Sequence, residues 1–169
     1  VWDAAGNVRE WVSGYRTVNG EIQIIPENDA AGCEIDELSA SSSLWRAIDT
    51  SGNLVAPGGN DTLKWRYQSG QIILGTTTTS ENAVRTAKLE SVSVAANVQQ
   101  TALNLLEEYG IKPGMPGVLA INTSGERLAA AGACYQDKSA CVRAIYGTYA
   151  RDSEPPEVGA RICYVEGLT

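Results

Sequence analysis

The chain has 169 residues, of which 43% are hydrophobic and 20% charged, and this length and composition are typical of one globular domain spanning residues 1–169. Its 13 basic and 20 acidic residues give a formal net charge of −7, which argues against a nucleic-acid partner because phosphate binding needs a surplus of Lys and Arg. It contains no histidine, which excludes Ser-His and Cys-His catalysis, and no run of about 18 apolar residues that would predict a membrane span.

Turn-forming residues divide the first 80 residues into short segments. The turn signals stand at 19–20, 51–53, 57–61 and 69–70. Between them, the runs 21–25, 62–67 and 71–75 predict short strands joined in hairpins. A threonine-rich stretch then leads into 81–90, where apolar residues show a weak helical periodicity.

A helix is predicted over 93–109, because apolar residues recur there at steps of three and four. These residues are Val94, Val98, Ala102, Leu105, Leu106 and Tyr109. Gly110 and Pro113 are typical helix-ending residues. Beyond them, 118–121 predicts a strand, 123–125 a turn, and the rest an irregular region rich in Gly, Ala and Tyr. Short strands with few helices predict an α+β fold.

Four cysteines are present, Cys33, Cys134, Cys141 and Cys163, and no two of them form a Cys-x-x-Cys pair. This spacing argues against a zinc site. Two interpretations stay open: buried free thiols, or a disulfide such as Cys134–Cys141, which would need an oxidising compartment.

The opening segment 3–11 reads Asp-Ala-Ala-Gly-Asn-Val-Arg-Glu-Trp. It resembles the D-x-x-G-N-V-x-E-W signature of formylglycine-generating-enzyme-type domains, a branch of the C-type lectin fold. The resemblance implies a calcium site built from the carboxylates of Asp3 and Glu10 and the carbonyl groups of Gly6 and Val8, which are suitable ligands for this hard cation. The alternative is a turn capped by Asp3, with Glu10 paired to an arginine and no metal. Calcium is the only cofactor expected.

The resemblance also places the opening motif well inside the family's domain. The chain is therefore expected to be the C-terminal part of a longer protein, or to carry an insert-like region over 14–75 in place of the missing upstream portion.

The closing segment, Val158-Gly159-Ala160-Arg161, is similar to the G-F-R strand that ends such domains. The residues before it resemble the variable region of diversity-generating retroelement target proteins, which include phage tropism determinants and bacterial surface display proteins. Segment 131–135 matches the G-G-x-W-x part of that pattern, 140–145 matches A-G-V-x-A-L, and 150–151 matches x-R. The variable region would cover about 130–162.

This resemblance implies a non-catalytic, sequence-diversified protein that binds a protein or cell-surface receptor and is displayed on a virion or bacterial surface. Its ligand-binding positions would be Ala133, Tyr135, Asp137, Ser139, Tyr146, Thr148, Tyr149, Ser153, Pro155 and Glu157. Tyrosine among small residues suits such a surface, because it offers contact area at little entropy cost. We expect these tyrosines to be exposed and Trp11 to be in the core.

Two other functions are considered. In the enzyme branch of the family, a closely spaced cysteine pair binds copper and oxidises cysteine in a target peptide; Cys134 and Cys141 are the candidates here, and their wider spacing argues against it. A calcium-dependent sugar lectin is the other alternative, but 26–29 contains the letters of a sugar motif in the wrong order.

Overall fold

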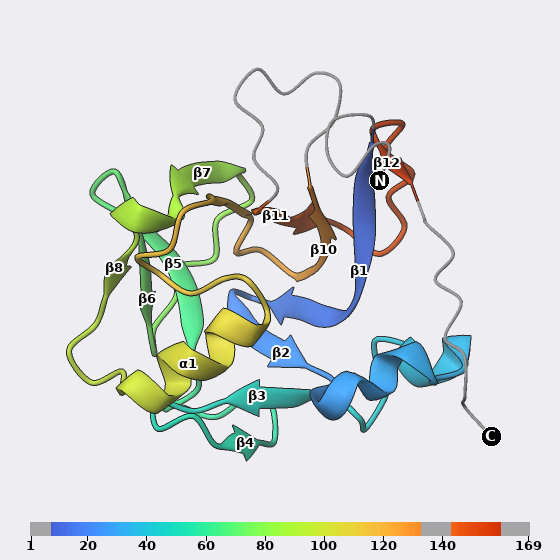
Figure 1. The fold of residues 1–169 in the computed structure, drawn as a ribbon, viewed down its shortest axis with the longest axis horizontal. Helices are drawn as coiled ribbons and strands as arrows, with labels where there is room; N and C mark the ends of the chain where they lie inside the picture. The colour runs from blue at the N-terminus through green and yellow to red at the C-terminus, as the bar shows by residue number, and fades with distance from the viewer. Residues whose placement is uncertain (1–7, 133–142, 160–169) are drawn as a thin grey trace.

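The computed structural model describes residues 8–132 and 143–159 (Figure 1). Over these residues the chain forms twelve strands, one α-helix and three 3-10 helices. The strands are β1 (Arg9–Val18), β2 (Glu21–Ile24), β3 (Arg46–Ile48), β4 (Leu54–Val55), β5 (Lys64–Gln68), β6 (Gln71–Gly75), β7 (Arg85–Lys88), β8 (Ser93–Val94), β9 (Val118–Ile121), β10 (Glu126–Ala131), β11 (Ala144–Tyr149) and β12 (Val158–Gly159). The helices are α1 (Gln100–Glu108), η1 (Pro26–Ala31), η2 (Ile35–Leu38) and η3 (Leu89–Ser91).

The strands form one mixed sheet in the order β7-β9-β11-β10-β1-β2-β5-β6-β8, with β3, β4 and β12 attached to its sides. Most neighbours are antiparallel, whereas β9 with β11, β6 with β8 and β1 with β12 are parallel. The predicted α+β class is therefore confirmed for the described part of the chain.

Strand β1 is central to this sheet and is divided by a wide bulge. Its pairing with β10 runs from Val12 opposite Ala129 directly to Arg16 opposite Leu128, so three residues of β1 have no partner in the register. Gly14 stands in this bulge at φ +76°, a conformation that glycine adopts without strain. The chain bends sharply here (Figure 1). Strand β2 pairs with β1 after the bulge and β12 pairs before it.

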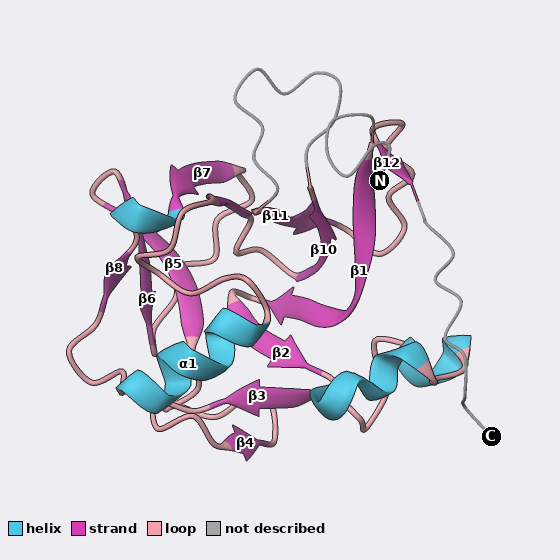
Figure 2. Cartoon of the chain, viewed as in Figure 1, coloured by secondary structure: helices cyan, strands magenta, loops and turns pink. Residues whose placement is uncertain are grey.

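The main core lies between the sheet and α1, which crosses in front of the strands (Figure 2). Trp65, Leu74 and Leu119 are fully buried side chains of the sheet, and Ala102 and Leu106 are those of the helix. A buried leucine or tryptophan contributes about 2–3 kcal/mol by leaving water, so these residues hold the helix on the sheet.

The predicted strands at 21–25, 62–67, 71–75 and 118–121 are confirmed, each to within two residues. The predicted helix was wrong at its start: it begins at Gln100, not at residue 93, and ends at Glu108. Residues 93–94 form β8 instead, because the backbone pairs with β6 there and the Ala95 N–H donates to the Leu74 carbonyl over 2.8 Å.

The weak helical periodicity over 81–90 also gave a wrong expectation. Residues Arg85–Lys88 form β7, which pairs along its whole length with the buried strand β9. Its exposure alternates from residue to residue, as expected for a strand with one face covered. Pairing with a neighbouring strand outweighed a local pattern that was not strong enough to form a helix.

Candidate functional site

Two tyrosines of β11 project from the same face of the sheet because the strand contains a bulge. Ala130 of β10 lies opposite Tyr146, and Leu128 lies opposite Tyr149, so two steps on β10 correspond to three on β11. One extra residue in a strand reverses the alternation of side chains beyond it. The candidate variable positions Tyr146 and Tyr149 therefore lie on the same face of the sheet. In a regular strand, residues three apart would point to opposite faces.

Arg9 of β1 contacts both tyrosines. Its guanidinium carbon is 3.7 Å from the centroid of the Tyr146 ring, and its Nη1 donates a 2.8 Å hydrogen bond to the Tyr149 hydroxyl oxygen. A cation over an aromatic ring is stabilised by roughly 0.5–2 kcal/mol, with the larger values where water is excluded. The Arg9 side chain is only 11% exposed, so this guanidinium is well placed to hold both rings in position.

Trp11 lies on the same face of the sheet, because it pairs with Ala130 of β10, which in turn pairs with Tyr146. Its ring meets that of Tyr149 edge-on, with 5.3 Å between the ring centroids. Edge-to-face pairs contribute about 0.5–1.5 kcal/mol beyond burial. Trp11, Tyr146 and Tyr149 are all half-buried. The expectation that Tyr146 and Tyr149 are exposed and Trp11 is in the core was therefore wrong, because these aromatic side chains cover one another. Tyr135, the third tyrosine of that expectation, lies outside the described residues.

Glu157, the residue just before β12, joins this group. The Arg9 N–H donates 2.8 Å to the Glu157 carbonyl, where β12 pairs with the start of β1. The Glu157 carboxylate lies 3.6 Å from Arg9 Nη1 and accepts a 3.4 Å hydrogen bond from the Tyr149 hydroxyl. We name these residues the Arg9 cluster: Arg9, Trp11, Tyr146, Tyr149 and Glu157. Burial raises the pKa of Tyr149, and the Arg9 hydrogen bond opposes that rise.

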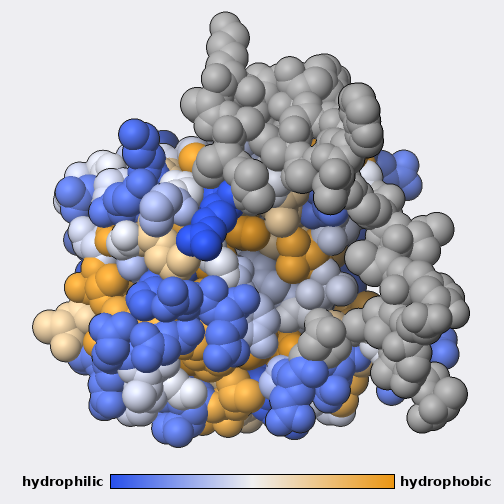
Figure 3. Space-filling model, in the orientation of Figure 1, coloured by the Kyte–Doolittle hydropathy of each residue, from blue (hydrophilic) through white to orange (hydrophobic). Residues whose placement is uncertain are grey.

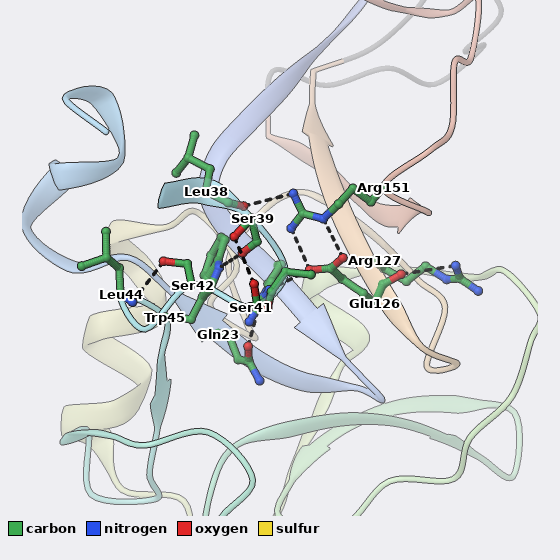
Figure 4. A network of polar contacts seen from close by, with 12 residues as sticks. Gln23, Leu38, Ser39, Ser41, Ser42, Leu44, Trp45, Glu126, Arg127 and Arg151 are labelled. Atoms are coloured by element: carbon green, nitrogen blue, oxygen red, sulfur yellow. Dashed lines mark hydrogen bonds and ion pairs between the residues drawn. The ribbon is translucent and has the colours of Figure 1, made fainter. Parts of the chain in front are cut away.

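Arg16, a second arginine of β1, lies beyond the bulge and shares the carboxylate of Glu126 with Arg151, which begins the β11–β12 connection. Glu126 accepts hydrogen bonds from both Arg16, over 2.7 Å, and Arg151, which approaches in bidentate geometry with two bonds of 2.8 Å. Arg151 also donates to the Leu38 carbonyl over 3.0 Å (Figure 4). Because bidentate pairs fix orientation as well as distance, Arg151 ties the chain that follows β11 to the body of the fold.

Arg16 is built into the body of the sheet. Its Nε donates to Gln23 over 2.8 Å, its Nη1 donates to the Ala40 carbonyl over 3.0 Å, and its guanidinium lies 4.2 Å from the Trp45 ring. Only 6% of its side chain is exposed. We name this group the Arg16 network: Arg16, Gln23, Trp45, Glu126 and Arg151.

The polar chain continues from this network across β2. Gln23 donates to Glu21 over 2.7 Å, and Glu21 also accepts hydrogen bonds from the Thr62 hydroxyl and from the Gly58 N–H. Buried polar groups are stabilising when every member has a partner. A satisfied network therefore runs through the sheet from Arg151 to the turn at Gly58.

The charges in this network shift one another. The guanidinium of Arg151, followed by that of Arg16, lowers the pKa of the Glu126 carboxyl, so the carboxylate stays ionised. The hydrogen bonds with Glu126 in turn raise the pKa of the Arg151 guanidinium. Burial lowers the pKa of Arg16 but its bonds with Glu126 oppose that. This network is a structural brace with ionised partners at neutral pH.

The described residues include six of the predicted ligand-binding positions. Tyr146, Tyr149 and Glu157 come together in the Arg9 cluster. Thr148, Ser153 and Pro155 are half-buried and are not members of this cluster. The other predicted positions, Ala133, Tyr135, Asp137 and Ser139, lie outside the described residues. Sequence reasoning missed Arg9 as the centre of the group.

The predicted calcium ligands are divided in the same way. Val8 is 41% exposed and Glu10 is half-buried at the start of β1, while Asp3 and Gly6 lie outside the described residues. Within residues 8–132 and 143–159, no three acidic, cysteine or histidine side chains gather as a metal site. Cys33 is a half-buried free thiol, and Cys134, Cys141 and Cys163 lie outside the described part.

Comparison with known proteins gives no match, either among protein-family models or among curated sequences. In the part of the chain that the structure describes, no helix has the length and apolar character needed to cross a bilayer.

Proposed function

We propose that this chain is a non-catalytic, sequence-diversified ligand-binding protein with a C-type lectin fold of the formylglycine-generating-enzyme branch. The observation that carries the proposal is the Arg9 cluster. Three residues that the sequence pattern marks as variable meet around a single arginine: Tyr146 and Tyr149 come from β11, and Glu157 precedes β12. A random set of positions on an irregular region has no reason to converge in this way.

The cluster is suited to recognition because its aromatic side chains are held before any ligand arrives. Tyr149 is fixed at its ring by Trp11 and at its hydroxyl by Arg9 and Glu157. Fixing a side chain in advance reduces the conformational entropy that binding would otherwise remove. Half-buried tyrosines keep part of each ring open for a partner, and aromatic anchors dominate binding energy in many interfaces.

The scaffold separates variable residues from the residues that hold them. The Arg16 network fixes Arg151 to Glu126 and thereby the end of β11, while Tyr146, Thr148 and Tyr149 project from the strand before it. A site is precise when its supporting residues are held by packing and by hydrogen bonds. Exchange of the projecting side chains would then alter specificity without rearranging the strand.

The partner is proposed to be a protein or receptor on a cell surface, met by a domain displayed on a virion or bacterial surface. The net charge of −7 favours partners with basic or neutral patches over nucleic acids. No described contact favours the copper oxidase, whose candidate ligands Cys134 and Cys141 lie outside the described residues.

The proposal is tested by comparing two displayed libraries of the chain. The first randomises Tyr146, Thr148, Tyr149, Ser153 and Glu157 with codons derived from an asparagine codon by changing adenines. The matched control randomises five exposed positions on β6, β7 and η3, namely Gln71, Thr86, Lys88, Glu90 and Ser91. Protease resistance measures folding, and sorting against a panel of purified proteins measures binding.

We expect the first library to fold as often as the control and to yield binders at least tenfold more often. Equal yields of binders, or wholesale unfolding of the first library, would contradict the proposal. A second check is the flanking DNA, which should carry a near-identical repeat of the 3′ coding end beside a reverse transcriptase gene, with adenines at the variable codons.

A further inference from the structure

A cavity of about 550 Å³ opens on the face of the sheet opposite to the Arg9 cluster. Its floor is formed by Val12, Ala129, Ala131 and Ile145, which alternate in register with the residues that carry the cluster. Side chains at neighbouring positions of a strand point to opposite faces. The two sites are therefore separated by the thickness of one sheet.

The cavity exists because small side chains meet at the β1 bulge. Ala129 and Ala131 of β10 and Ala30 of η1 contribute little volume, and Gly14 contributes no side chain at all. Larger residues close the space around them: Ile25, Tyr109 and Ile111 are among its walls. A volume of this size lies within the range of roughly 300–1,000 Å³ that small-molecule sites occupy.

Two carboxylates belong to the lining of this otherwise mainly apolar cavity. Glu27 comes from η1 and Glu108 from the last turn of α1, and both are exposed. In the described part of the chain neither is in an ion pair, whereas Glu21, Glu107, Glu126 and Glu157 each have a basic partner within 4.0 Å. No basic side chain is among the described residues that line the cavity. Figure 3 shows mainly hydrophilic residues (blue) on this face of the molecule, with hydrophobic residues (orange) exposed between them.

Tyr109 adds a third recognition element beside Glu108. Burial, with a smaller contribution from the Glu108 charge, raises the pKa of the Tyr109 hydroxyl, which therefore stays protonated at neutral pH. Its ring presents a face that attracts cations as well as apolar groups. An apolar floor, an aromatic wall and two carboxylates at the rim are complementary to a molecule with an apolar body and a positive end.

We propose that this cavity binds a small cationic amphiphile, an aryl- or alkylammonium compound, with its hydrocarbon part on Ala129, Ala131 and Ile145 and its ammonium group toward Glu27 and Glu108. The net charge of −7 draws such cations toward the protein. The site does not depend on the proposed function, because its residues lie on the other face of the sheet. Of its lining, Ala131 and Ile145 are the ones inside the predicted variable region, and neither is a predicted variable position.

The test is a titration of the full chain with three probes of one shape: tryptamine, which is cationic at pH 7, the neutral alcohol tryptophol, and anionic indole-3-propionate. Methyl chemical shifts of Ile111, Ala129 and Ile145 report occupancy. We expect tryptamine to shift these methyl signals and to bind at least tenfold more tightly than tryptophol, while indole-3-propionate binds more weakly than either.

The variants Glu27→Gln and Glu108→Gln should each weaken tryptamine binding about fivefold and leave tryptophol unchanged. Glu90→Gln, an exposed control outside the cavity, should leave both unchanged. Ala131→Met, which fills the floor, should weaken both probes, and its melting temperature checks that the fold is intact. Equal affinity for tryptamine and tryptophol, methyl shifts confined to residues outside the cavity, or wild-type tryptamine binding by the double variant Glu27→Gln/Glu108→Gln would overturn the proposal.

Discussion

Two arginines of strand β1, Arg9 and Arg16, have similar surroundings on either side of the bulge. Each guanidinium lies over an aromatic ring, at 3.7 Å from Tyr146 for Arg9 and 4.2 Å from Trp45 for Arg16. Both are well buried, with 11% and 6% of the side chain exposed. The same chemical device therefore occurs twice on one strand.

The difference lies in where their partners come from. Arg16 pairs with Glu126 at 2.7 Å and with Gln23 at 2.8 Å, both on neighbouring strands of the sheet. Arg9 pairs with Glu157 at 3.6 Å, and this partner belongs to the predicted variable region. Arg16 therefore contacts residues of the sheet body, whereas Arg9 contacts residues that the proposed function treats as exchangeable. The predictions below separate these two roles.

The largest expected effect is that of removing Arg16. Arg16→Met should lower the free energy of unfolding by about 3–5 kcal/mol, because it removes one partner of a buried pair, leaves Gln23 Oε1 without its donor and leaves Glu126 with Arg151 alone. Arg9→Met should cost less, about 1–2 kcal/mol, since the contacts it loses include a cation–π contact, a hydrogen bond to a neutral hydroxyl and a partly exposed ion pair at 3.6 Å. Urea unfolding at pH 7 measures both, and equal losses would contradict the division of roles.

The bulge that separates the two arginines provides the next test. At Gly14, with φ +76°, an added Cβ would lie 2.8 Å from the Cβ of Ala30, so Gly14→Ala should cost about 2–3 kcal/mol through backbone strain and the clash together. Gly70→Ala is the matched control: its φ is +83° and nothing lies within 4 Å of the added carbon, so it should cost about 1 kcal/mol. Thermal unfolding of both variants isolates the contribution of the clash, and equal losses would show that the bulge is not tightly packed.

The sequence predicted the mixed class and three of the six strands before residue 80, because the signals of these three are local. The turn at Asn19-Gly20 and the short apolar runs around it specify hairpins without reference to distant residues. Residues 93–94 were assigned to a helix because Val94 fits the helical spacing. Their backbone forms β8 because it pairs with β6, a strand some twenty residues earlier. The periodicity of apolar residues carries no information about such pairing.

The candidate site was predictable in its members but not in its geometry. The variable-region pattern named Tyr146, Tyr149 and Glu157, and the structure brings them together. Their meeting depends on an extra residue in β11, which reverses the side-chain alternation and which no single-strand pattern reveals. Arg9 falls at an unspecified position of the opening signature and was not predicted as a site residue. Its alternation with Trp11 on β1 was the available signal that both side chains share a face.

Acidification should weaken the Arg16 network, because its central carboxylate is stabilised by two arginines. Because Arg151 and Arg16 lower the pKa of Glu126, the stability due to this carboxylate is complete above the ordinary value of 4.5 and is lost as the pH falls through the lowered value. Unfolding free energies between pH 7 and pH 3 should thus fall less steeply in Glu126→Gln than in the wild type. Identical slopes would show that Glu126 is not held by its arginines. The wild-type slope also includes Asp49, whose pKa is lowered by Asn53, so the difference between the two proteins is the informative quantity.

The smallest loss of stability is expected for a substitution of Glu157, which belongs to the predicted variable region. Glu157→Gln removes a charge that lies 3.6 Å from Arg9 Nη1 and is about one quarter exposed, and it keeps a hydrogen-bond acceptor near the Tyr149 hydroxyl. A partly exposed pair at this distance contributes about 0.2–1 kcal/mol and is screened by salt. Urea unfolding should therefore show a loss below about 1 kcal/mol that shrinks further at 1 M salt, when the Debye length is near 3 Å. The same substitution at Glu126 is the internal control, because its carboxylate has two arginine partners at 2.7 and 2.8 Å and 18% exposure, and its loss should be larger and less sensitive to salt. If Glu157→Gln lowered the free energy of unfolding more than Glu126→Gln, Glu157 would itself stabilise the fold, and exchange at position 157 would not be tolerated as proposed.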